Sequence, residues 1–318
     1  MATFNGARHL QEQLQSLAKQ TRLPDELVVT DDCSSDNTMN ILREFSEYAP
    51  FPVFITQNRE NIGWGRNFSK ALMDTSGDLV FLSDQDDVWM PGKLEYMVKL
   101  AEENPDYLLL MNDTMITDAN LNATGYTKLG QLKAAGLSED RFVMGSCSTV
   151  RRELIDLCLP VPKGFTEHDI WISHFANNLS GRLISDKVLQ YYRRHDQNVT
   201  NTISSYTGKV HILHKIKLKL RKNSAALKDP GKQLRLIRKS ENLKDGFQRA
   251  LKKDTGKYAG PLEQKIIELE NKIEKLKLRK EIRKNTFSRR SLLILKNYRA
   301  GFYSEFSGIK SALRDLFG

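Results

Sequence analysis

The sequence has few cysteines and no long apolar run, and both absences narrow its class. Cys33, Cys147 and Cys158 are the three cysteines among 318 residues, too few and too widely spaced for a disulfide framework or a CxxC metal site. We therefore expect ordinary core positions for them and a reducing compartment. No apolar stretch approaches the roughly 20 residues of a membrane-spanning helix, and no basic segment followed by an apolar one opens the chain. These features predict a cytoplasmic protein that is soluble or lies on a membrane surface.

Charge is divided unevenly along the chain. The whole sequence has a net charge of +10, but residues 207–318 hold 30 Lys and Arg against 11 Asp and Glu. Residues 1–206 hold the remaining 19 basic and 28 acidic side chains. This asymmetry predicts two modules with different partners, an ordinary domain at 1–206 and a basic helical extension at 207–318.

The first module alternates strand-like apolar runs with helical patterns. Leu10, Leu14 and Leu17 share one face of a helix, and the runs ELVVTDD, PVFITQN and DLVFLSD read as strands between helices. This β-α-β order predicts an α/β fold with a doubly wound, mostly parallel sheet and a site at the carboxyl ends of its strands. A first strand should precede Thr3, where almost no residues remain, so we expect it to be short or missing.

Acidic side chains follow two of these strands. Asp31 and Asp32 end one run, and the stretch FLSDQDDVW places Asp84, Asp86 and Asp87 directly after another. Like charges this close repel, so the acids either sit on an exposed turn or bind a divalent cation through hard oxygen ligands. Their position at a predicted strand end favours the cation.

A set of motifs resembles the family-2 glycosyltransferases, nucleotide-sugar enzymes of the GT-A fold. The similarity is closest to a bacterial branch labelled rhamnosyltransferase, which builds surface polysaccharides. In chain order the matching stretches are TFNGARHLQEQLQSLAKQT, LVVTDDCSSDNT, NRENIGWGRNFSKAL, GDLVFLSDQDDVWMPGKLE, MGSCSTVRREL, EHDIWIS and YYRRHDQNVT. The resemblance covers residues 1 to about 206. It implies a Rossmann-like GT-A domain that transfers a sugar from a UDP- or dTDP-sugar.

The resemblance also implies a donor site. In the family, the opening motif borders the nucleobase, and a carboxylate accepts the imide N–H of uracil or thymine, for which Asp32 is the better match. Arg66 lies near the nucleotide or is a helix-surface arginine. The residues expected to bind the nucleotide sugar are Thr3, Phe4, Asn5, Asp31, Asp32, Arg66 and Asp84.

A divalent cation, Mg²⁺ or Mn²⁺, is implied at the diphosphate. Asp84 is expected to approach the ribose and Asp86 to bind the metal. His195, in the segment RRHDQN, aligns with a histidine that reaches the metal or the diphosphate in some relatives, and is otherwise structural. Asp87 is expected to support the site or cap a helix.

The resemblance implies that the catalytic base is Asp169, in the motif EHDIWIS at the start of a helix. This carboxylate would take the proton of an acceptor hydroxyl while the anomeric centre inverts. His168 and Trp171 either line the acceptor cleft or, in the case of Trp171, pack the helix. The implied acceptor is a lipid-linked sugar or a glycan.

The basic extension has helical apolar patterns. One repeats at heptad spacing and predicts a helical hairpin, or less readily a coiled coil; its residues are Leu262, Ile266, Leu269, Ile273 and Leu276. A second suits an interfacial membrane helix or one docked on the protein's own core; its residues are Leu295, Tyr298, Phe302, Phe306, Ile309 and Leu313.

These helices predict contact with an anionic membrane surface at the inner face of the plasma membrane, and no nucleic acid partner. The alternative function is a family member without activity that acts as a membrane-surface binding or scaffold module.

Overall fold

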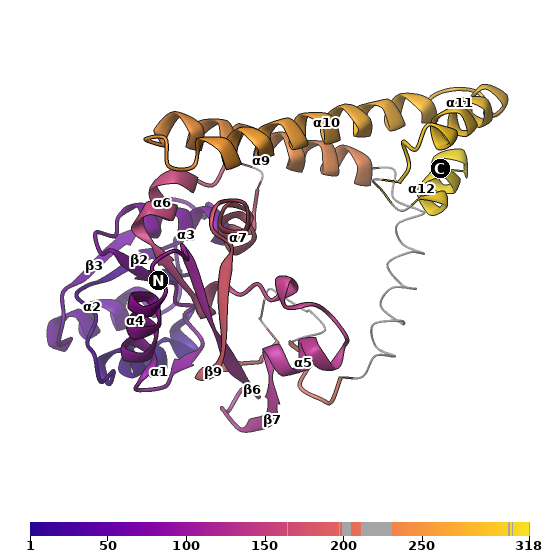
Figure 1. Ribbon diagram of the computed structural model, residues 1–318. Helices are drawn as coiled ribbons and strands as arrows, with labels where there is room; N and C mark the ends of the chain where they lie inside the picture. Colours follow the sequence, from indigo (N-terminus) through magenta and orange to yellow (C-terminus); the bar gives the residue numbers. More distant parts are fainter. Residues whose placement is uncertain are drawn as a thin grey trace. The chain divides into compact units, whose positions relative to one another are not determined.

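The computed structural model divides the chain into two compact units (Figure 1). Unit 1 comprises residues 1–215 together with 249–258, and unit 2 comprises residues 216–248 together with 259–318. The described residues are 1–163, 165–196, 198, 205–210, 231–304, 306 and 308–317. Residues 211–230 of the predicted basic extension therefore lie outside the described residues. The predicted division after residue 206 stays a prediction, and it differs from these units in placing 249–258 in the extension.

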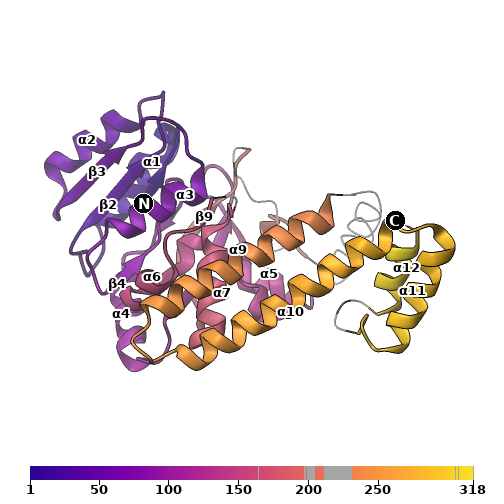
Figure 2. The same ribbon diagram turned by 90° about the horizontal axis from the view of Figure 1, so that it is seen from above.

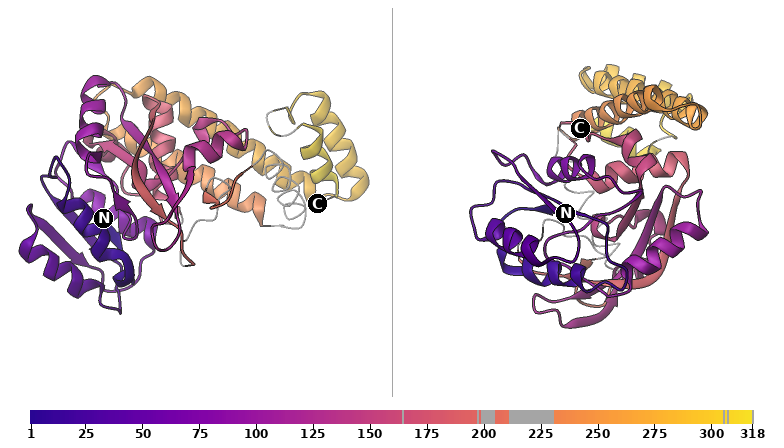
Figure 3. Two further views of the ribbon diagram at one scale, coloured as in Figure 1. Left: turned by 90° about the horizontal axis from the view of Figure 1, so that it is seen from below. Right: turned by 90° about the vertical axis from the view of Figure 1, so that its left-hand side faces the viewer.

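Unit 1 begins with three parallel strands in the order β1-β2-β3 (Figures 1 and 3). The strands are β1 (Ala2–Thr3), β2 (Leu27–Asp31) and β3 (Val53–Gln57), connected by α1 (Ala7–Ala18), α2 (Thr38–Tyr48) and followed by α3 (Trp64–Met73). The predicted alternation of strands and helices is confirmed here. β1 has two residues, the short first strand that the sequence predicts.

A second, mixed sheet completes unit 1, with the order β4-β8-β6-β9-β5 and β7 paired to β6. Its strands are β4 (Leu79–Phe81), β5 (Val88–Trp89), β6 (Leu109–Thr117), β7 (Ala123–Thr127), β8 (Ser148–Arg151) and β9 (Arg182–Arg193). Its helices are α4 (Lys93–Glu103), α5 (Lys128–Ala134), the short 3₁₀ turns η1 (Glu139–Arg141) and η2 (Gly145–Cys147), α6 (Arg152–Cys158) and α7 (His168–Leu179). β6 and β9 are parallel, whereas β4 pairs antiparallel with β8. The α/β class is therefore confirmed, but β4 is hydrogen-bonded to a strand that follows it by about seventy residues, not to the first sheet.

The helix α1 packs by the face that its leucine spacing predicts. Leu10, Leu14 and Leu17 are buried against Leu42 and Phe45 of α2. Cys147 and Cys158 are buried, as predicted. Cys33 is exposed and has a φ of 66°, so the prediction that all three cysteines lie in the core is wrong at the turn that follows β2.

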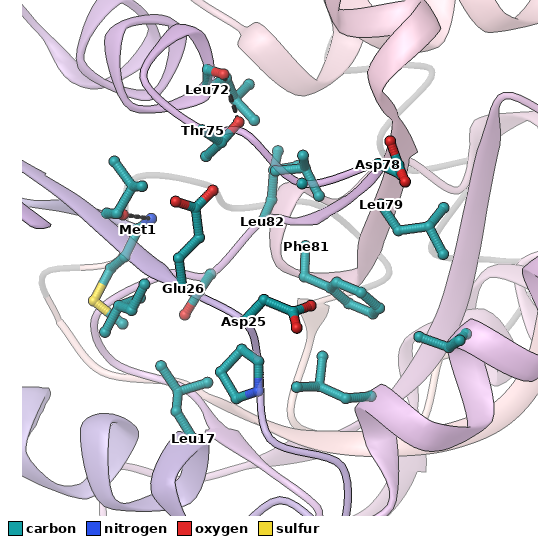
Figure 4. Close-up of a pocket in the computed structure, with 18 of the residues that line it drawn as sticks. Met1, Leu17, Asp25, Glu26, Leu72, Thr75, Asp78, Leu79, Phe81 and Leu82 are labelled. Carbon is teal, nitrogen blue, oxygen red and sulfur yellow. Dashed lines mark hydrogen bonds between the residues drawn. The ribbon is translucent and has the colours of Figure 1, made fainter. Parts of the chain in front are cut away.

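A cavity of about 310 Å³, lined by apolar side chains and by acids such as Asp25, Glu26 and Asp78, lies beside this packing (Figure 4). Its walls come from β2, β4, α3 and α4, and include Leu17, Leu72, Leu79 and Leu82. None of the predicted site residues lines it. This cavity is therefore distinct from the acids at the strand ends.

Unit 2 is helical, and its longest helices lie side by side (Figures 1 and 2). They are α9 (Lys232–Lys253), whose last residues belong to unit 1, and α10 (Ala259–Arg283). Gln233 Nε2 donates to the carbonyl of Leu276 over 2.7 Å, and Lys277 pairs with Glu241 over 2.8 Å. Leu262, Leu269, Ile273 and Leu276 are buried. The predicted helical hairpin is confirmed.

The C-terminal segment forms two helices, α11 (Phe287–Arg299) and α12 (Ile309–Phe317). The prediction of one continuous helical face from 295 to 313 is wrong, because Gly301 and Gly308 have positive φ angles and turn the chain between the helices. Tyr303 in that turn is fully buried with Ile282, Ile294 and Ala312. None of the helices among the described residues is long and apolar enough to cross a bilayer.

Candidate functional site

The carboxyl end of β2 carries the first pair of predicted acids. Asp31 is fully buried, and its Oδ2 accepts hydrogen bonds from Thr3 Oγ1 (2.8 Å) and Ser34 Oγ (2.5 Å). Its Oδ1 accepts from the Ser34 N–H and from Gln57 Nε2. Asp31 and Thr3 therefore join β1, β2 and β3, and these contacts hold the strand ends that carry the site.

Asp32 organises the loop after β3. Its Oδ1 accepts from the Ile62 N–H (2.8 Å) and Asn58 Nδ2 (3.0 Å), and its Oδ2 accepts from the Gly63 N–H (2.9 Å). An ionised carboxylate has about four acceptor positions, and these contacts occupy three. Asp32 therefore keeps capacity for one further donor, such as a nucleobase imide.

The opening motif is tied to the acidic stretch by Gln85. The Phe4 N–H donates to Gln85 Oε1 (2.9 Å), and Gln85 Nε2 donates to the Phe4 carbonyl (3.0 Å). The Phe4 ring is 45% exposed, and Asn5 has a φ of 46°. A Cβ on Gly6 would stand 2.2 Å from Gln85 Oε1, so a side chain at this position would disturb the two hydrogen bonds between Phe4 and Gln85. These bonds leave the ring of Phe4 exposed beside the acids.

Arg66 lies on the exposed face of α3. It lines a cavity of about 580 Å³ together with Lys70, Lys163 and Arg249. Among the described residues these four cations outnumber the single acid of the lining, Asp74. The structure therefore places Arg66 in a cationic depression, and its predicted contact with the nucleotide stays a prediction.

Asp84, Asp86 and Asp169 come together although they lie far apart in the sequence. Asp84 is half-buried after β4, and its pKa is raised to about 7, first by burial and then by the charges of Asp86 and Asp169. The site thus collects acids from the end of β4 and from the first turn of α7. Lys128 offsets part of this charge at Asp84. Such a concentration of acids with perturbed pKa values is a frequent mark of a functional site.

The two predicted metal ligands are neighbours. Asp86 Oδ2 lies 2.8 Å from His195 Nε2 and accepts from Asn198 Nδ2 over 3.3 Å. The His195 N–H donates to Asn198 Oδ1 (2.7 Å), which fixes the turn after β9. Asn198 was not among the predicted residues, although it ends the RRHDQN segment that was.

Asp87 supports the site from the interior. It is fully buried and accepts from Ser146 Oγ (2.7 Å), Gln190 Nε2 (3.0 Å) and the Arg193 N–H (3.3 Å). Burial, followed by the charges of Asp86 and Asp84, raises the pKa of Asp87 well above its usual range. The helix-cap alternative for Asp87 is wrong, because strand β5 follows it directly.

Two buried cations were not predicted. Arg193 donates from Nε to the Asp86 carbonyl (2.9 Å) and pairs with Glu12. Lys93 donates to the Ser146 carbonyl (2.8 Å), and burial lowers its pKa to about 8. A signal was present in the sequence, since each cation lies inside an apolar or aromatic pattern, MPGKL or YYRR, where a charge needs a partner.

The N-terminal turn of α7 carries the predicted base. Asp169 is half-buried, and its Oδ1 accepts the N–H of Ile170 (2.8 Å). His168 is buried and stacks on Phe68 with ring centroids 4.0 Å apart, and burial lowers its pKa to about 4. Trp171 is fully buried and donates from Nε1 to the Cys158 carbonyl (2.7 Å). Trp171 therefore packs the helix, and the prediction that it lines an acceptor cleft is wrong.

The donor set fits a hard divalent cation. Among the described residues no group of three or more His, Cys, Asp or Glu side chains is arranged as a metal cage. Asp84 and Asp86 nevertheless present carboxylate oxygens, the ligands that Mg²⁺ and Mn²⁺ prefer. The raised pKa of Asp84 indicates negative charge that such a cation would offset.

Comparison with known proteins finds a family resemblance over the first part of the chain. Residues 1–157 match the family described as "Glycosyl transferase family 2". The chain is 28% identical over 224 residues to a glycosyltransferase of Nostoc sp., alr2836, covering 65% of this chain and 67% of the relative. It is 35% identical over 99 residues to the dTDP-rhamnosyl transferase RfbG of Shigella flexneri, covering 30% and 34%. The matched part thus spans about a third of the Shigella protein.

Two solved structures of S. aureus TarS (residues 1–349) resemble the fold. One has a TM-score of 0.53 at 18% identity, and one in complex with UDP has a TM-score of 0.51 at 17% identity. Each match covers 86% of this chain and 88% of the TarS chain. At this identity the likeness shows the fold, and it confirms the predicted GT-A class.

Proposed function

We propose that the chain transfers a sugar from a UDP- or dTDP-sugar to a lipid-linked or polysaccharide acceptor, with inversion of the anomeric centre. The match of residues 1–157 to glycosyl transferase family 2 supports this proposal. The observation that carries the proposal is that Asp84 lies close enough to both Asp86 and Asp169 for their charges to act on it. This supports one site that holds the proposed cation-binding pair and the proposed base.

The nucleotide is bound by the ends of β1 and β2. The exposed Phe4 ring offers a stacking face, and Asp32 keeps one acceptor position for the imide N–H of uracil or thymine. Both bases present the same imide edge, so both donors are candidates. Similarity to a dTDP-rhamnosyl transferase makes dTDP-rhamnose the first donor to test.

The diphosphate is bound at the acidic turn. Asp86, with His195 beside it, would hold Mg²⁺ or Mn²⁺, and Asp84 would face the ribose. When bound, the cation would supply Lewis-acid stabilisation of the departing nucleoside diphosphate. Arg193 holds the Asp86 carbonyl, and Asp87 is held by Ser146 and Gln190, so the acidic turn is ordered before the donor binds.

Asp169 acts as the base. Its carboxylate takes the proton of an acceptor hydroxyl while that oxygen bonds to the anomeric carbon and the bond from this carbon to the diphosphate oxygen breaks. One base suffices for a single in-line displacement. The position of Asp169 in the first turn of α7, within electrostatic range of Asp84, supports this role.

The enzyme works at the inner face of the plasma membrane, where lipid-linked acceptors are presented. The basic composition of residues 207–318 supports this location, since anionic lipids attract Lys and Arg. The nucleotide-binding unit would then meet an acceptor carried on the same surface.

Replacement of the base tests the proposal. Asp169→Asn should lower kcat by about 10²–10⁴-fold, the usual contribution of a general base, while the nucleotide still raises the Tm. Glu167→Gln is the control, since Glu167 is a neighbouring acid at the N-cap of the same helix. Transfer by Asp169→Asn at the wild-type rate would show that the base is another residue.

A panel of nucleotide sugars tests the donor. Thermal shift with and without Mn²⁺ should show stabilisation by a UDP- or dTDP-sugar that depends on the cation. Absence of stabilisation by every member of either class would contradict the donor proposal. Donor binding without transfer to any acceptor would favour the scaffold alternative.

A further inference from the structure

The two C-terminal helices have an unusual concentration of exposed apolar side chains. Of the seventeen large apolar side chains that are exposed in the described residues, seven lie between residues 287 and 317. We name six of them the tip surface: Phe287, Leu292, Leu295, Ile309, Leu313 and Phe317. Exposed apolar patches of this kind mark interaction sites far more often than scattered single residues do.

The exposure is imposed by the packing of α12. This helix buries Asp315, Ala312 and Ser311, and it exposes Ile309, Leu313 and Phe317. Leu316 packs in part against the core, as an amphipathic helix requires, but Asp315 is buried beside it while Ile309, Leu313 and Phe317 face the solvent. A buried carboxylate requires partners that hold it inside.

A buried ionic cluster supplies these partners. Asp315 is fully buried and accepts from Arg279 Nε (2.7 Å), from Arg283 Nη2 (2.6 Å) and from the Tyr303 hydroxyl (3.0 Å). The two arginines lie on α10, so α12 is fixed to that helix by its acid. Rotating α12 to bury its apolar face would expose Asp315 and leave both arginines without it.

An aromatic contact links the two helices of the tip surface. The rings of Phe287 on α11 and Phe317 on α12 have centroids 6.4 Å apart. Ile294 on α11 faces inward, where it packs with Tyr303 and Ala312. Leu293 on α11 and Leu316 on α12 also pack in part against this core, so each helix divides its large apolar side chains between the core and the solvent.

The charges around the tip surface are positive. From 286 to 318 the sequence holds six Lys and Arg against two acids, and one of these acids is the buried Asp315. Arg289, Lys296, Arg299 and Lys310 are exposed on the same two helices as the apolar side chains. Apolar side chains that enter the acyl boundary, ringed by cations that meet anionic headgroups, are the mark of a bilayer-binding surface.

We propose that the tip surface of α11 and α12 binds the surface of an anionic phospholipid bilayer. The apolar side chains enter the interface, and the basic residues contact the headgroups. This deepens the membrane location proposed above, and vesicle binding can be measured without sugar transfer. A failed vesicle assay would leave the transfer reaction standing, and an inactive enzyme would leave vesicle binding standing.

Sedimentation of the full chain with vesicles tests the proposal. The probes are vesicles of phosphatidylcholine alone and of an equal mixture of phosphatidylcholine and phosphatidylglycerol. The wild-type protein should bind the mixed vesicles and bind phosphatidylcholine much more weakly. The double variant Leu292→Gln, Leu313→Gln should lower the partition coefficient for the mixed vesicles on the order of tenfold, because interfacial binding scales with the apolar area buried.

A matched pair on α10 controls for a general loss of apolar surface. Ile267 and Leu278 are 58% and 43% exposed, against 69% and 47% for Leu292 and Leu313. Ile267→Gln with Leu278→Gln should leave binding within twofold of the wild type. Thermal unfolding of both variants checks that each is folded.

Three results would overturn the proposal. The tip variant could bind as the wild type does, the wild type could bind neither vesicle, or both double variants could lose binding equally. Light scattering adds a separate outcome. A wild-type dimer that becomes monomeric in the tip variant, together with no vesicle binding, would assign the surface to a second copy of the chain.

Discussion

Asp315 in unit 2 is fully buried and Asp84 in unit 1 is half-buried, and the charged groups that act most strongly on them are opposite in sign. Asp315 accepts from two arginines and a tyrosine hydroxyl. Asp84 has Asp86 and Asp169 near it, and its pKa is raised to about 7 by burial and by their charges. Asp315 is bonded directly by arginines, whereas the strongest charged neighbours of Asp84 are acids and the charge of Lys128 acts less strongly on it.

The difference separates a structural acid from a functional one. A buried ion pair that is complete within the chain fixes geometry, as it does for the orientation of α12. A cluster of acids whose strongest charged neighbours are other acids is held together by the fold, and its charge is available to an incoming cation or diphosphate complex. The comparison therefore predicts that removal of Asp315 lowers the free energy of unfolding and that removal of Asp84 raises it.

Removal of the complete ion pair should have the largest effect on stability. Asp315→Ala leaves Arg279 and Arg283 without their acid and should lower the free energy of unfolding of unit 2 by about 3–5 kcal/mol. Amide hydrogen exchange in α11 and α12 would report the loss locally. The control Lys277→Ala breaks an exposed pair with Glu241 and should cost less than about 1 kcal/mol. Equal effects of the two changes would contradict the structural role of Asp315.

His168 provides a pH test within unit 1. Its pKa is lowered from 6.5 to about 4 by burial, so between these values the unfolded chain binds a proton that the folded chain does not. Stability from the neutral ring is complete above pH 6.5 and is lost as the pH falls through about 4, by at most about 3 kcal/mol. His168→Phe keeps the stack on Phe68 and should remove this dependence in urea unfolding from pH 4 to 7.

The same variant separates packing from acceptor binding. If His168 only packs, His168→Phe should transfer sugar with kcat and KM near the wild-type values. A large rise of the acceptor KM in a protein of unchanged stability would restore the acceptor-cleft role.

Removal of Asp84 should have the smallest effect and the opposite sign. Without a divalent cation at pH 8, Asp84→Asn should raise the free energy of unfolding by about 1 kcal/mol, a reduced value because the site is open to water. Because the pKa of Asp84 is raised in the folded protein, its contribution should also lower the free energy of unfolding of the wild type as the pH rises from about 4 to about 7. Destabilisation by Asp84→Asn would place Asp84 in the same class as Asp315.

Local patterns were sufficient to predict the elements and the strand-end acids. Leucine spacing predicted α1, and the apolar runs predicted β2, β3 and β4, so Asp32 and Asp84 could each be placed directly after a strand. The motif EHDIW likewise predicted the first turn of α7, where Asp169 lies. These predictions needed only the period of the apolar residues and the residues that follow each run.

Contacts between distant segments were not predictable. Three contacts join parts of the chain that no local pattern relates. They are the pairing of β4 with β8, the hydrogen bond from Arg193 to the Asp86 carbonyl, and the ion pair of Asp315 with Arg279 of α10. The apolar face from 295 to 313 was predicted as one helix, because the period alone does not show that Gly301 adopts a positive φ. Long-range packing decides each of these features.

The most direct test of the central claim is the effect of Mn²⁺ on nucleotide binding. If the acids at the end of β4 need an external cation, UDP or dTDP with Mn²⁺ should raise the Tm of the wild type by about 5 °C at saturating ligand, and neither component alone should do so. Asp86→Ala should abolish this shift, while Asp78→Ala, which removes an exposed acid before β4, should retain it. An equal shift in Asp86→Ala, or none in the wild type, would contradict the account.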